Sequence, residues 1–444
     1  MRYFALSLTF ILTLSLTLQA QTPSGQKSPA LSPGSAKSVG MSAERLARID
    51  AMAESAVEGG DVPGVVALVA RNGKIVYHKA FGVADNTTGR ELKKDDIFRI
   101  ASQTKAITST AVMMLWEEGH FKLDDPISKW IPEFKHAQVL DKYNFTAGTY
   151  TTIPAKSEIT IRQLLTHSSG LGYGLIDGDE RIKLIYKQAG ITDLFTTESV
   201  TIADSVKKLA KLPLHFHPGD EYRYSEGLDV LGYFIEILSG MTFEEFLRTR
   251  LFEPLGMKDT YFYLPDNKAK RLVTVQKPED GKWVKYTGQP DYYDADYPIK
   301  GAKTFFSGGA GLSSTAYDYA TFLQMYLNGG ELNGMRFLSR TTIATMMAEQ
   351  MDMGSTTSHY GLAFGVLTKE GVAVGGQGGD GTFTWGGYFN SQYFADPKEN
   401  IIGVILKQTR YQNNDDTSCS LSSWSFRPSM TSVQVLNFKV NRCS

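Results

Sequence analysis

The sequence predicts a mixed α/β (α+β) protein, in which an antiparallel sheet flanked by helices is built from both ends of the chain and a mostly helical insertion lies between its two parts. Segments rich in β-formers occur early, within residues 65–81, and again late, within residues 362–407. Between them, most segments place apolar residues at helical spacing and are separated by Pro and Gly.

The amino-terminal part contains a helix and a hairpin. Residues 43–56 predict the helix, because Leu, Ile and Met recur there at helical spacing. The β-rich runs Val65–Ala70 and Lys74–Phe81 follow, on either side of Asn72-Gly73. Asn-Gly between two such runs is typical of a tight hairpin turn, so these strands form one antiparallel pair.

The middle of the chain is predicted to be helical, and strands return late. We expect helices over residues 104–118, 205–209, 228–238 and 243–252. We expect strands over residues 362–367, 372–375, 384–394 and 401–407. The tail from Thr417 is Ser-rich and lacks a helical stripe. It holds both cysteines, Cys419 and Cys443, which could pair in an oxidising compartment.

Composition and charge are those of an ordinary soluble globular protein. Of 444 residues, 42% are hydrophobic and 21% charged, and the formal net charge is -1. A chain this close to neutral lacks the basic surface that binds nucleic acid or an anionic membrane. We therefore expect no nucleic-acid partner.

The first 20 residues have the layout of a secretory signal. Arg2 precedes an apolar run from Phe4 to Leu18, and Ala20 offers a small residue for cleavage. The alternative is a membrane anchor, but the run is shorter than the roughly 20 residues that a spanning helix needs. We predict export to the periplasm or secretion, with no membrane span after the signal is removed.

Ser-x-x-Lys patterns begin at Ser24, Ser102 and Ser205, and their context distinguishes them. The first lies in a Pro- and Ser-rich stretch, and the last precedes lysines of a polar face. Ser102 opens a helix with an apolar face, and Lys105 lies on the same side of that helix. A buried lysine can lose its proton and act as base for a serine nucleophile. The alternative is that Ser102 only caps the helix.

Two further segments carry residues suited to catalysis. Tyr224 follows a Pro-Gly turn, and a phenol can act as a base if a lysine stabilises the phenolate. The alternative is a packing tyrosine, since the chain has 22. Trp385-Gly386-Gly387 lies in a predicted strand, where paired glycines indicate close approach of a ligand. Such a strand could lend a backbone N–H to an oxyanion hole, unless it is a bulge beside a packed tryptophan.

Together these segments resemble the serine β-lactamase and penicillin-binding protein superfamily, in particular the class C-like branch that includes carboxylesterases. Three other stretches match in the same order, namely Leu164–Leu171, Phe252–Met257 and Gly308–Thr315. The resemblance extends from about Met41 to Gln408. It implies a β-lactamase/transpeptidase-like fold and acyl transfer through a serine.

The resemblance also implies a role for each matched residue. Ser102 would be the acylated nucleophile, Lys105 its proton partner, and Tyr224 the tyrosine of the Tyr-x-Asn motif. The strand with the two glycines would replace the family's Lys-Thr-Gly strand. The backbone N–H groups of Ser102 and Tyr388 would form the oxyanion hole. The residues expected to contact substrate are Trp385, Gly386, Gly387 and Glu226.

The chain departs from the family's pattern at three places. Glu226 replaces the asparagine of Tyr-x-Asn, and Trp385 replaces the lysine of Lys-Thr-Gly. The tail lacks the amphipathic helix with which the family closes. Because that lysine holds the carboxylate of a β-lactam, and an ionised Glu226 facing the cleft would repel it, we expect a preference for uncharged esters.

These features divide the chain into four parts. They are a signal peptide (1–20), a flexible linker (21–40), a β-lactamase-like catalytic unit (41–411) and an atypical tail (412–444). Within the catalytic unit, residues 41–85 and 300–411 form the α/β part and residues 86–299 the helical part.

Other candidate sites are weaker. His215-x-His217 has the spacing of strand ligands, but no further His, Asp or Cys cluster in the sequence supports a metal site. His167 lies in a matched motif and is expected to be a structural hydrogen-bonding residue. The sequence contains no Gly-x-Ser-x-Gly elbow and no phosphate-binding glycine loop. We therefore expect neither a metal nor a cofactor.

Three functions remain open from the sequence. The first is an exported serine hydrolase that cleaves small carboxylic esters through an acyl-enzyme on Ser102. The second is a β-lactamase or a D-alanyl carboxypeptidase or aminopeptidase that cleaves amides. The third is a non-catalytic binding protein of the same fold, against which the intact Ser102, Lys105 and Tyr224 argue. Both enzymatic functions imply a small-molecule ester or amide as the partner.

Overall fold

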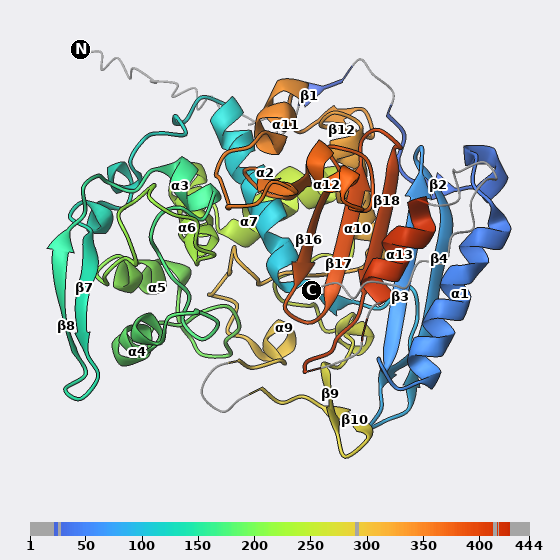
Figure 1. The fold of residues 1–444 in the computed structure, drawn as a ribbon, viewed down its shortest axis with the longest axis horizontal. Helices are drawn as coiled ribbons and strands as arrows, with labels where there is room; N and C mark the ends of the chain where they lie inside the picture. Colours follow the sequence, from blue (N-terminus) through green and yellow to red (C-terminus); the bar gives the residue numbers. More distant parts are fainter. Residues whose placement is uncertain (1–21, 25–27, 289–292, 412–414, 416, 427–444) are drawn as a thin grey trace, which may run out of the picture.

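The computed structural model describes residues 22–24, 28–288, 293–411, 415 and 417–426. Its central feature is a sheet with the strand order β14-β15-β16-β17-β18-β3-β4-β2, with β5 paired to β4. In chain order the strands are β2 (Ser32–Pro33), β3 (Gly64–Arg71), β4 (Lys74–Asp85), β5 (Arg90–Glu91), β14 (Ser358–Tyr360), β15 (Gly365–Leu367), β16 (Phe383–Gly387), β17 (Ser391–Asp396) and β18 (Ile401–Leu406). Apart from the parallel pair β2 and β4, neighbouring strands are antiparallel. The prediction of one sheet built from both ends of the chain is confirmed (Figure 1).

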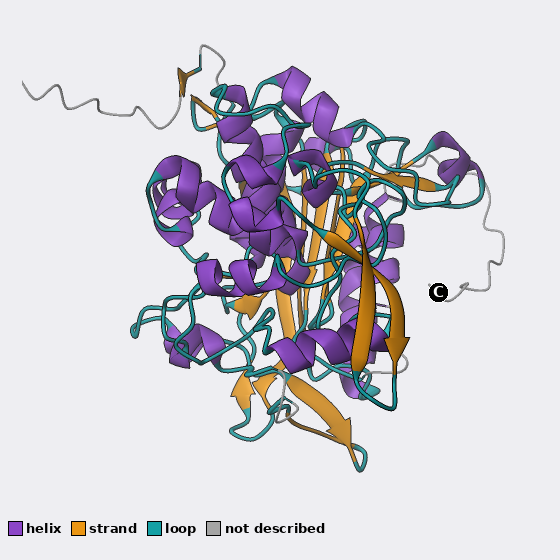
Figure 2. Cartoon of the chain, turned by 90° about the vertical axis from the view of Figure 1, so that its left-hand side faces the viewer, coloured by secondary structure: helices purple, strands orange, loops and turns teal. Residues whose placement is uncertain are grey.

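Strand β3 shows why the sheet is covered on both faces. Successive side chains of a strand point to opposite faces, and this strand is apolar at consecutive positions. Residues 65, 67 and 69 pack with α1 (Ala43–Glu58) and α13 (Thr417–Phe426). Residues 66, 68 and 70 pack in the larger core with α10 (Ala316–Leu327). Figure 2 shows the strands between helices on both sides.

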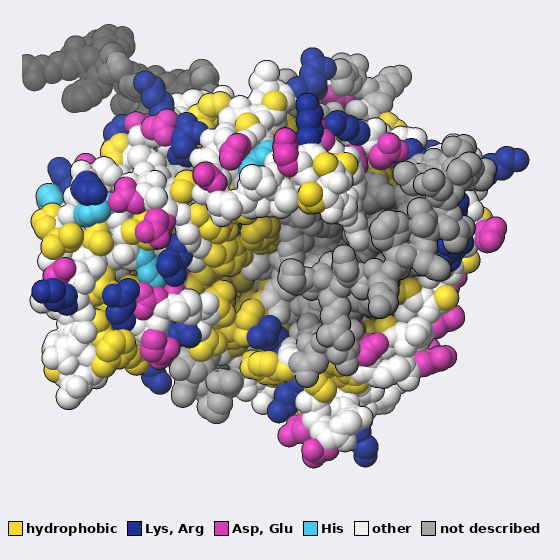
Figure 3. All heavy atoms as spheres, in the orientation of Figure 1, with side chains coloured by type: hydrophobic (Ala, Val, Ile, Leu, Met, Phe, Trp, Pro, Cys, Tyr) yellow, Lys and Arg dark blue, Asp and Glu magenta, His cyan; other side chains and the backbone are white. Residues whose placement is uncertain are grey.

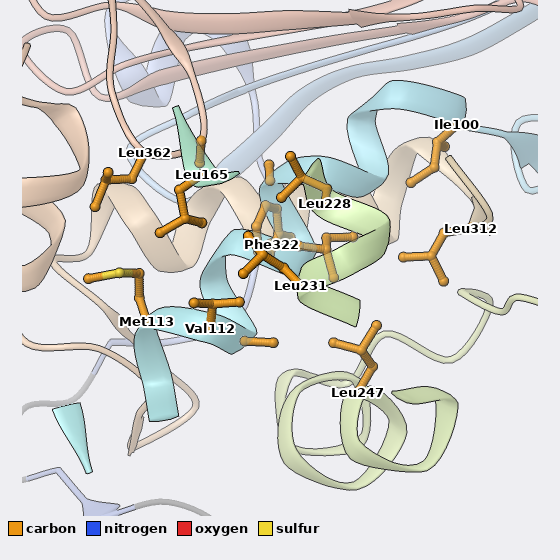
Figure 4. Close-up of a cluster of buried hydrophobic side chains, with 14 of the residues drawn as sticks. Ile100, Val112, Met113, Leu165, Leu228, Leu231, Leu247, Leu312, Phe322 and Leu362 are labelled. Carbon is orange, nitrogen blue, oxygen red and sulfur yellow. The ribbon is translucent and has the colours of Figure 1, made fainter. Parts of the chain in front are cut away.

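The helical part surrounds one buried helix, α2 (Thr104–Glu117), whose residues from Thr104 to Leu115 are all buried. Helix α2 packs against α6 (Gly227–Ser239), which in turn packs against α3 (Ile161–Leu165), α5 (Ile202–Leu209) and α7 (Phe243–Leu247). Helix α4 (Glu180–Ala189) also belongs to this part. Figure 4 shows Val112 and Met113 of α2 among side chains of α3, α6 and α10. A helix that is buried on all sides packs as the centre of a core, so its amino-terminal end is held rigidly.

The remaining elements are short. The strand pairs are β6 (Phe98–Arg99) with β11 (Ser313–Ser314), β7 (Gln138–Asn144) with β8 (Thr149–Pro154), and β9 (Gln276–Glu279) with β10 (Lys282–Lys285). A small sheet contains β1 (Thr22–Pro23), β12 (Glu331–Leu332) and β13 (Met335–Arg336), and the short helices are α8 (Glu253–Leu255), α9 (Tyr297–Lys300), α11 (Arg340–Met347) and α12 (Lys369–Ala373). Across the described ranges, no helix is both long and apolar enough to cross a bilayer.

The structure differs from two strand predictions. Residues 372–375 form the end of helix α12 and a turn, because Gly375 adopts a φ of 101° that breaks any strand. The single strand expected at 384–394 is a hairpin of β16 and β17 instead. Asn390 allows that turn, since it adopts a left-handed φ of 67° and its N–H donates to the Gly387 carbonyl at 2.9 Å.

Two described segments, residues 28–40 and 417–426, are also more ordered than predicted. Within the expected linker, Leu31, Ala36 and Val39 are buried against the sheet and α1, so this stretch belongs to the fold. The tail, expected to lack a helix, forms α13, and Leu421 packs it into the core beside α1. The predicted signal peptide at 1–20 and the pairing of Cys419 with Cys443 lie outside the described residues and side chains.

Candidate active site

Ser102 lies where strand β6 turns into helix α2. The 3₁₀ helix η2 (Ala101–Gln103) makes this turn, and Ala101 adopts a left-handed φ of 45° that a residue with a Cβ rarely takes. The Ile100 N–H donates to the Leu312 carbonyl at 3.0 Å and fixes the turn to the 308–315 stretch. Ser102 remains partly exposed while the residues on both sides of it are buried. Backbone strain at Ala101, held in place by buried neighbours beside a partly exposed serine, is typical of a functional site.

Lys105 lies one helical turn after Ser102 and its side chain is 1% exposed. Its Nζ is 3.5 Å from the Ser102 Oγ and donates to the Gly309 carbonyl at 2.8 Å. Spacing along one helix face accounts for the first contact. The bond to Gly309 depends on residues 308–315, one of the stretches that resemble the family.

Tyr224 meets Lys105 from the loop that precedes α6. The Lys105 Nζ lies 4.5 Å from the centroid of the Tyr224 ring and 5.4 Å from that of Tyr173. Among the described residues, the buried Tyr224 hydroxyl has no hydrogen-bond partner. Buried hydroxyls are nearly always bonded, so an unbonded one beside a lysine and a serine is suited to exchange a proton with a reactant. The structure therefore brings Ser102, Lys105 and Tyr224 together.

His167 holds the Tyr224 loop in place. Its Nδ1 accepts a hydrogen bond from the Ser225 N–H at 3.2 Å, and its ring lies 4.6 Å from that of Tyr224. Burial, and then the charge of Lys105, hold the pKa of His167 well below its usual value. The imidazole is neutral and buttresses the tyrosine, in line with the structural role expected from the sequence.

Strand β16 runs past the nucleophile and supplies the tryptophan. The Trp385 ring lies 5.9 Å from Tyr224 and 5.2 Å from Tyr360, so three aromatic rings line this side of the site. A Cβ on Gly387 would lie 2.5 Å from the Ile100 carbonyl oxygen and 2.3 Å from the Ser391 Oγ. Only glycine lets β16 approach the Ser102 turn this closely.

The Gly387→Ala variant is expected to lower kcat by at least about tenfold, because moving β16 away from Ser102 by a fraction of an ångström disturbs the reacting geometry. Gly386→Ala is the matched control, since a Cβ there meets its nearest atom at 3.5 Å, an ordinary contact. We expect it to stay within about threefold of the parent rate. Steady-state kinetics on a nitrophenyl ester measure both, and equal losses would contradict the close-approach argument.

Tyr388 directly follows β16, next to the close contact between Gly387 and Ile100. The Arg410 guanidinium lies 3.6 Å from the centroid of the Tyr388 ring and donates to the Tyr388 carbonyl at 2.9 Å. The backbone of Tyr388 is therefore restrained at the edge of the site.

Glu226, expected to contact substrate, is turned away from it. Its side chain is buried, and Oε1 accepts a hydrogen bond from the Gly174 N–H at 3.2 Å. Burial, together with the carboxyl groups of Asp193 and Asp229, raises the pKa of Glu226 well above its usual value. A neutral, inward-facing carboxyl group exerts no charge repulsion on a substrate.

Two residues near Lys105 were missed by sequence reasoning. Asp229 is buried, and its Oδ1 accepts from the N–H of Gly309, whose carbonyl accepts from Lys105. Burial raises the pKa of Asp229, against the opposing charge of Lys105. The Tyr173 ring lies beside Tyr224, with its centroid 5.4 Å from the Lys105 Nζ. Asp229 stands in the same stretch as Tyr224, but nothing in its local pattern indicates that it faces the 308–311 turn.

The two histidines considered as metal ligands have other partners. The His215 Nε2 lies 2.9 Å from the Asp177 Oδ2, and the His217 Nδ1 accepts from the Lys156 N–H at 3.3 Å. In the part of the chain that the structure describes, no group of three or more His, Cys, Asp or Glu side chains is arranged to hold a metal ion.

The face seen in Figure 3 is hollowed at its centre, where hydrophobic side chains gather. Ala101 belongs to a buried aromatic cluster with Tyr173, Phe195, Tyr293 and Phe389, against which Leu175, Tyr224 and Tyr388 pack. Leu175 and Phe195 also line a hollow of about 390 Å³ between α4 and residues 190–198. Ser102 therefore borders an apolar, aromatic environment.

A partly exposed serine, with a buried lysine one turn later on a core helix and an antiparallel sheet beside it, is the arrangement of a serine hydrolase. The chain belongs to the beta-lactamase family, whose model matches residues 49–423.

Relatives within this family carry different activities. Esterase EstB of Burkholderia gladioli is 30% identical over 390 residues, which cover 83% of this chain and 92% of the esterase. A putative D-alanyl-D-alanine carboxypeptidase of Escherichia coli O157:H7 is 27% identical, covering 80% of this chain and 79% of its own. The solved structure of EstCE1, a hydrolase with promiscuous acyltransferase activity, superposes with a TM-score of 0.73 at 26% identity, over 86% of this chain and 98% of that chain.

Proposed function

We propose that this protein is an exported esterase that hydrolyses small carboxylic esters through an acyl-enzyme on Ser102. The observation that carries this proposal is the tryptophan of β16. By the resemblance of this strand to the Lys-Thr-Gly strand of the superfamily, Trp385 takes the place of the lysine that would hold a β-lactam carboxylate. Trp385 forms an aromatic wall with Tyr224 and Tyr360. Such a wall suits an uncharged acyl or alcohol group and offers no cation to a carboxylate.

The proposed reaction begins with attack of the Ser102 Oγ on the ester carbonyl carbon. The pair of Lys105 and Tyr224 takes the serine proton, and the N–H groups of Ser102 and Tyr388 stabilise the oxyanion. The C–O bond to the alcohol then breaks, and the alcohol leaves with that proton. Water attacks the acyl-enzyme in the same way and releases the carboxylic acid. The Lys105 Nζ, 3.5 Å from the Ser102 Oγ, needs only a small movement to reach hydrogen-bonding distance.

The second candidate, a β-lactamase or D-alanyl peptidase, is favoured by the carboxypeptidase relative. The sequence suggested two reasons against it, the tryptophan and the charge of Glu226. With Glu226 buried and its pKa raised, the second reason no longer holds, and the preference for esters rests on Trp385 alone.

We expect kcat/KM to be higher for a nitrophenyl butyrate than for a chromogenic cephalosporin at the same pH. A site without the lysine loses a charge-assisted hydrogen bond to the β-lactam carboxylate, about 1.5–3 kcal/mol, or roughly tenfold or more in rate. The Trp385→Lys variant should narrow the gap between the two substrates. A clear preference of the unmodified protein for the cephalosporin would favour the second candidate.

A further inference from the structure

The turn between β16 and β17 contains Tyr388, whose N–H is the proposed donor of the oxyanion hole. Hydrogen bonds from residues outside the hairpin hold this turn. The turn comprises residues 388–390 and ends with Asn390 in a left-handed conformation. Arg410 donates to the Tyr388 carbonyl at 2.9 Å, and the Thr409 N–H donates to the Phe389 carbonyl at 3.1 Å. Two successive carbonyls of the turn are thus bonded to the chain that follows β18.

The third residue of the turn is anchored by its side chain. The Asn390 Nδ2 donates to the Asp415 Oδ2 at 2.6 Å and to the Thr409 Oγ1 at 3.0 Å. Because a carboxylate is the acceptor, the first of these bonds is charge-assisted and directional. Asp415 therefore links the turn to the start of α13.

Asp415 is itself held by a buried ion pair. Its Oδ2 lies 2.5 Å from the Lys407 Nζ, and both side chains are 1% exposed. Lys407 also donates to the Thr417 Oγ1 at 2.7 Å and to the Ser418 Oγ at 3.1 Å. Although burial opposes it, the charge of Lys407 lowers the pKa of Asp415, so the carboxylate stays ionised.

A buried ion pair is often no more stabilising than apolar residues of the same volume, but it does select one geometry. Here the selected geometry is that of the turn beside Ser102. We propose that Asp415 and Arg410 are positioning residues that hold residues 388–390, so that the Tyr388 N–H points at the substrate's carbonyl oxygen. This inference rests on the proposed function, since it assigns that N–H to the oxyanion hole.

The test exchanges the donor and the acceptor of the Asn390–Asp415 contact. Asn390→Asp keeps the side-chain size and the tolerance for a left-handed φ, but it places two carboxylates face to face. We expect kcat on nitrophenyl butyrate to fall by about tenfold or more, with KM within about threefold, because the oxyanion hole acts mainly in the transition state. Adding Asp415→Asn restores one carboxylate and one amide at this contact, with their positions exchanged. The double variant should then recover at least about threefold of the lost kcat, a non-additive result.

A second variant keeps the inference testable if Asn390→Asp does not fold. Arg410→Gln removes the guanidinium from a partly exposed position, and it should also lower kcat by about tenfold with little change in KM. The matched control is Glu331→Gln, which breaks the buried ion pair of Glu331 with Arg336 (2.9 Å) on β12 and β13. It should leave kcat unchanged while lowering the melting temperature.

The outcomes separate this inference from the proposed function. Suppose that Ser102→Ala is inactive, but that Asn390→Asp and Arg410→Gln fold and keep the parent kcat. That result overturns the positioning role and leaves the proposed function standing. The positioning role is also overturned if kcat falls in step with the melting temperature, to the same extent in these two variants as in Glu331→Gln. Activity retained in Ser102→Ala overturns both proposals.

Discussion

The Ser102→Ala variant is expected to lose turnover and covalent labelling by a fluorophosphonate while keeping its fold. Removing the nucleophile of a serine hydrolase lowers the rate by roughly 10⁵-fold or more, because no other group forms the acyl-enzyme. The Ser102 Oγ is 3.5 Å from the Lys105 Nζ, a weak contact, so its removal should change the melting temperature little. Ester hydrolysis, peptide mapping of the labelled site and a thermal melt measure the three effects.

The other two Ser-x-x-Lys serines are the controls for this prediction. The Ser205 Oγ donates to the Thr192 carbonyl at 2.8 Å, and the Ser24 Oγ donates to Glu331. Both bonds are structural, so Ser205→Ala and Ser24→Ala should keep parent activity and labelling. Near-normal turnover in Ser102→Ala, or a label mapped to either control serine, would reject the nucleophile assignment.

Lys105→Met and Tyr224→Phe are each expected to lower kcat/KM by at least about a hundredfold, the scale of a lost general acid–base group. Methionine keeps the length and apolar stem of the lysine within the core and removes its charge, its bond to Gly309 and its contact with Ser102. Phenylalanine keeps the ring packed between His167 and Trp385. Because the Tyr224 hydroxyl has no partner among the described residues, its loss should barely change stability.

Tyr173→Phe separates the two tyrosines beside Lys105. Its hydroxyl, too, is buried without a partner in the described part of the chain, but its ring lies farther from the lysine, at 5.4 Å against 4.5 Å. We expect less than about a fivefold loss. In the double variant of Lys105 and Tyr224, the losses should be far from additive if the pair moves one proton together. If the losses in rate are small and additive, or if Tyr173→Phe loses more activity than Tyr224→Phe, then the assignment of Lys105 and Tyr224 as the general base is wrong.

Much of the fold was predictable because local patterns encode it. The Asn72-Gly73 turn and the apolar runs beside it predicted the hairpin of β3 and β4. The prediction of one continuous strand at 384–394 was wrong, because the β-forming residues continue through a turn at Asn390 that divides the segment into β16 and β17. The helix of the tail has no apolar stripe of its own and forms where α1 and β18 offer a surface.

By itself the sequence identified Ser102 as the candidate nucleophile and Lys105 as its first partner. Ser102 lies in the 3₁₀ turn η2 and Lys105 in the first turn of α2, three residues later, so helical geometry alone brings them to one face. It also determined the approach of β16, because Gly387 is the residue that leaves room for it.

Only the tertiary structure decided the rest of the site. Tyr224 lies more than a hundred residues after Lys105 and reaches it through α6 and His167. Glu226, two residues from Tyr224, turns inward, where burial and then the carboxyl groups of Asp193 and Asp229 raise its pKa well above the usual value. Asp415 meets Asn390 because β18 pairs between β17 and β3 and so brings the tail to the turn. Contacts of this kind depend on how distant elements pack, and no short stretch of residues carries that information.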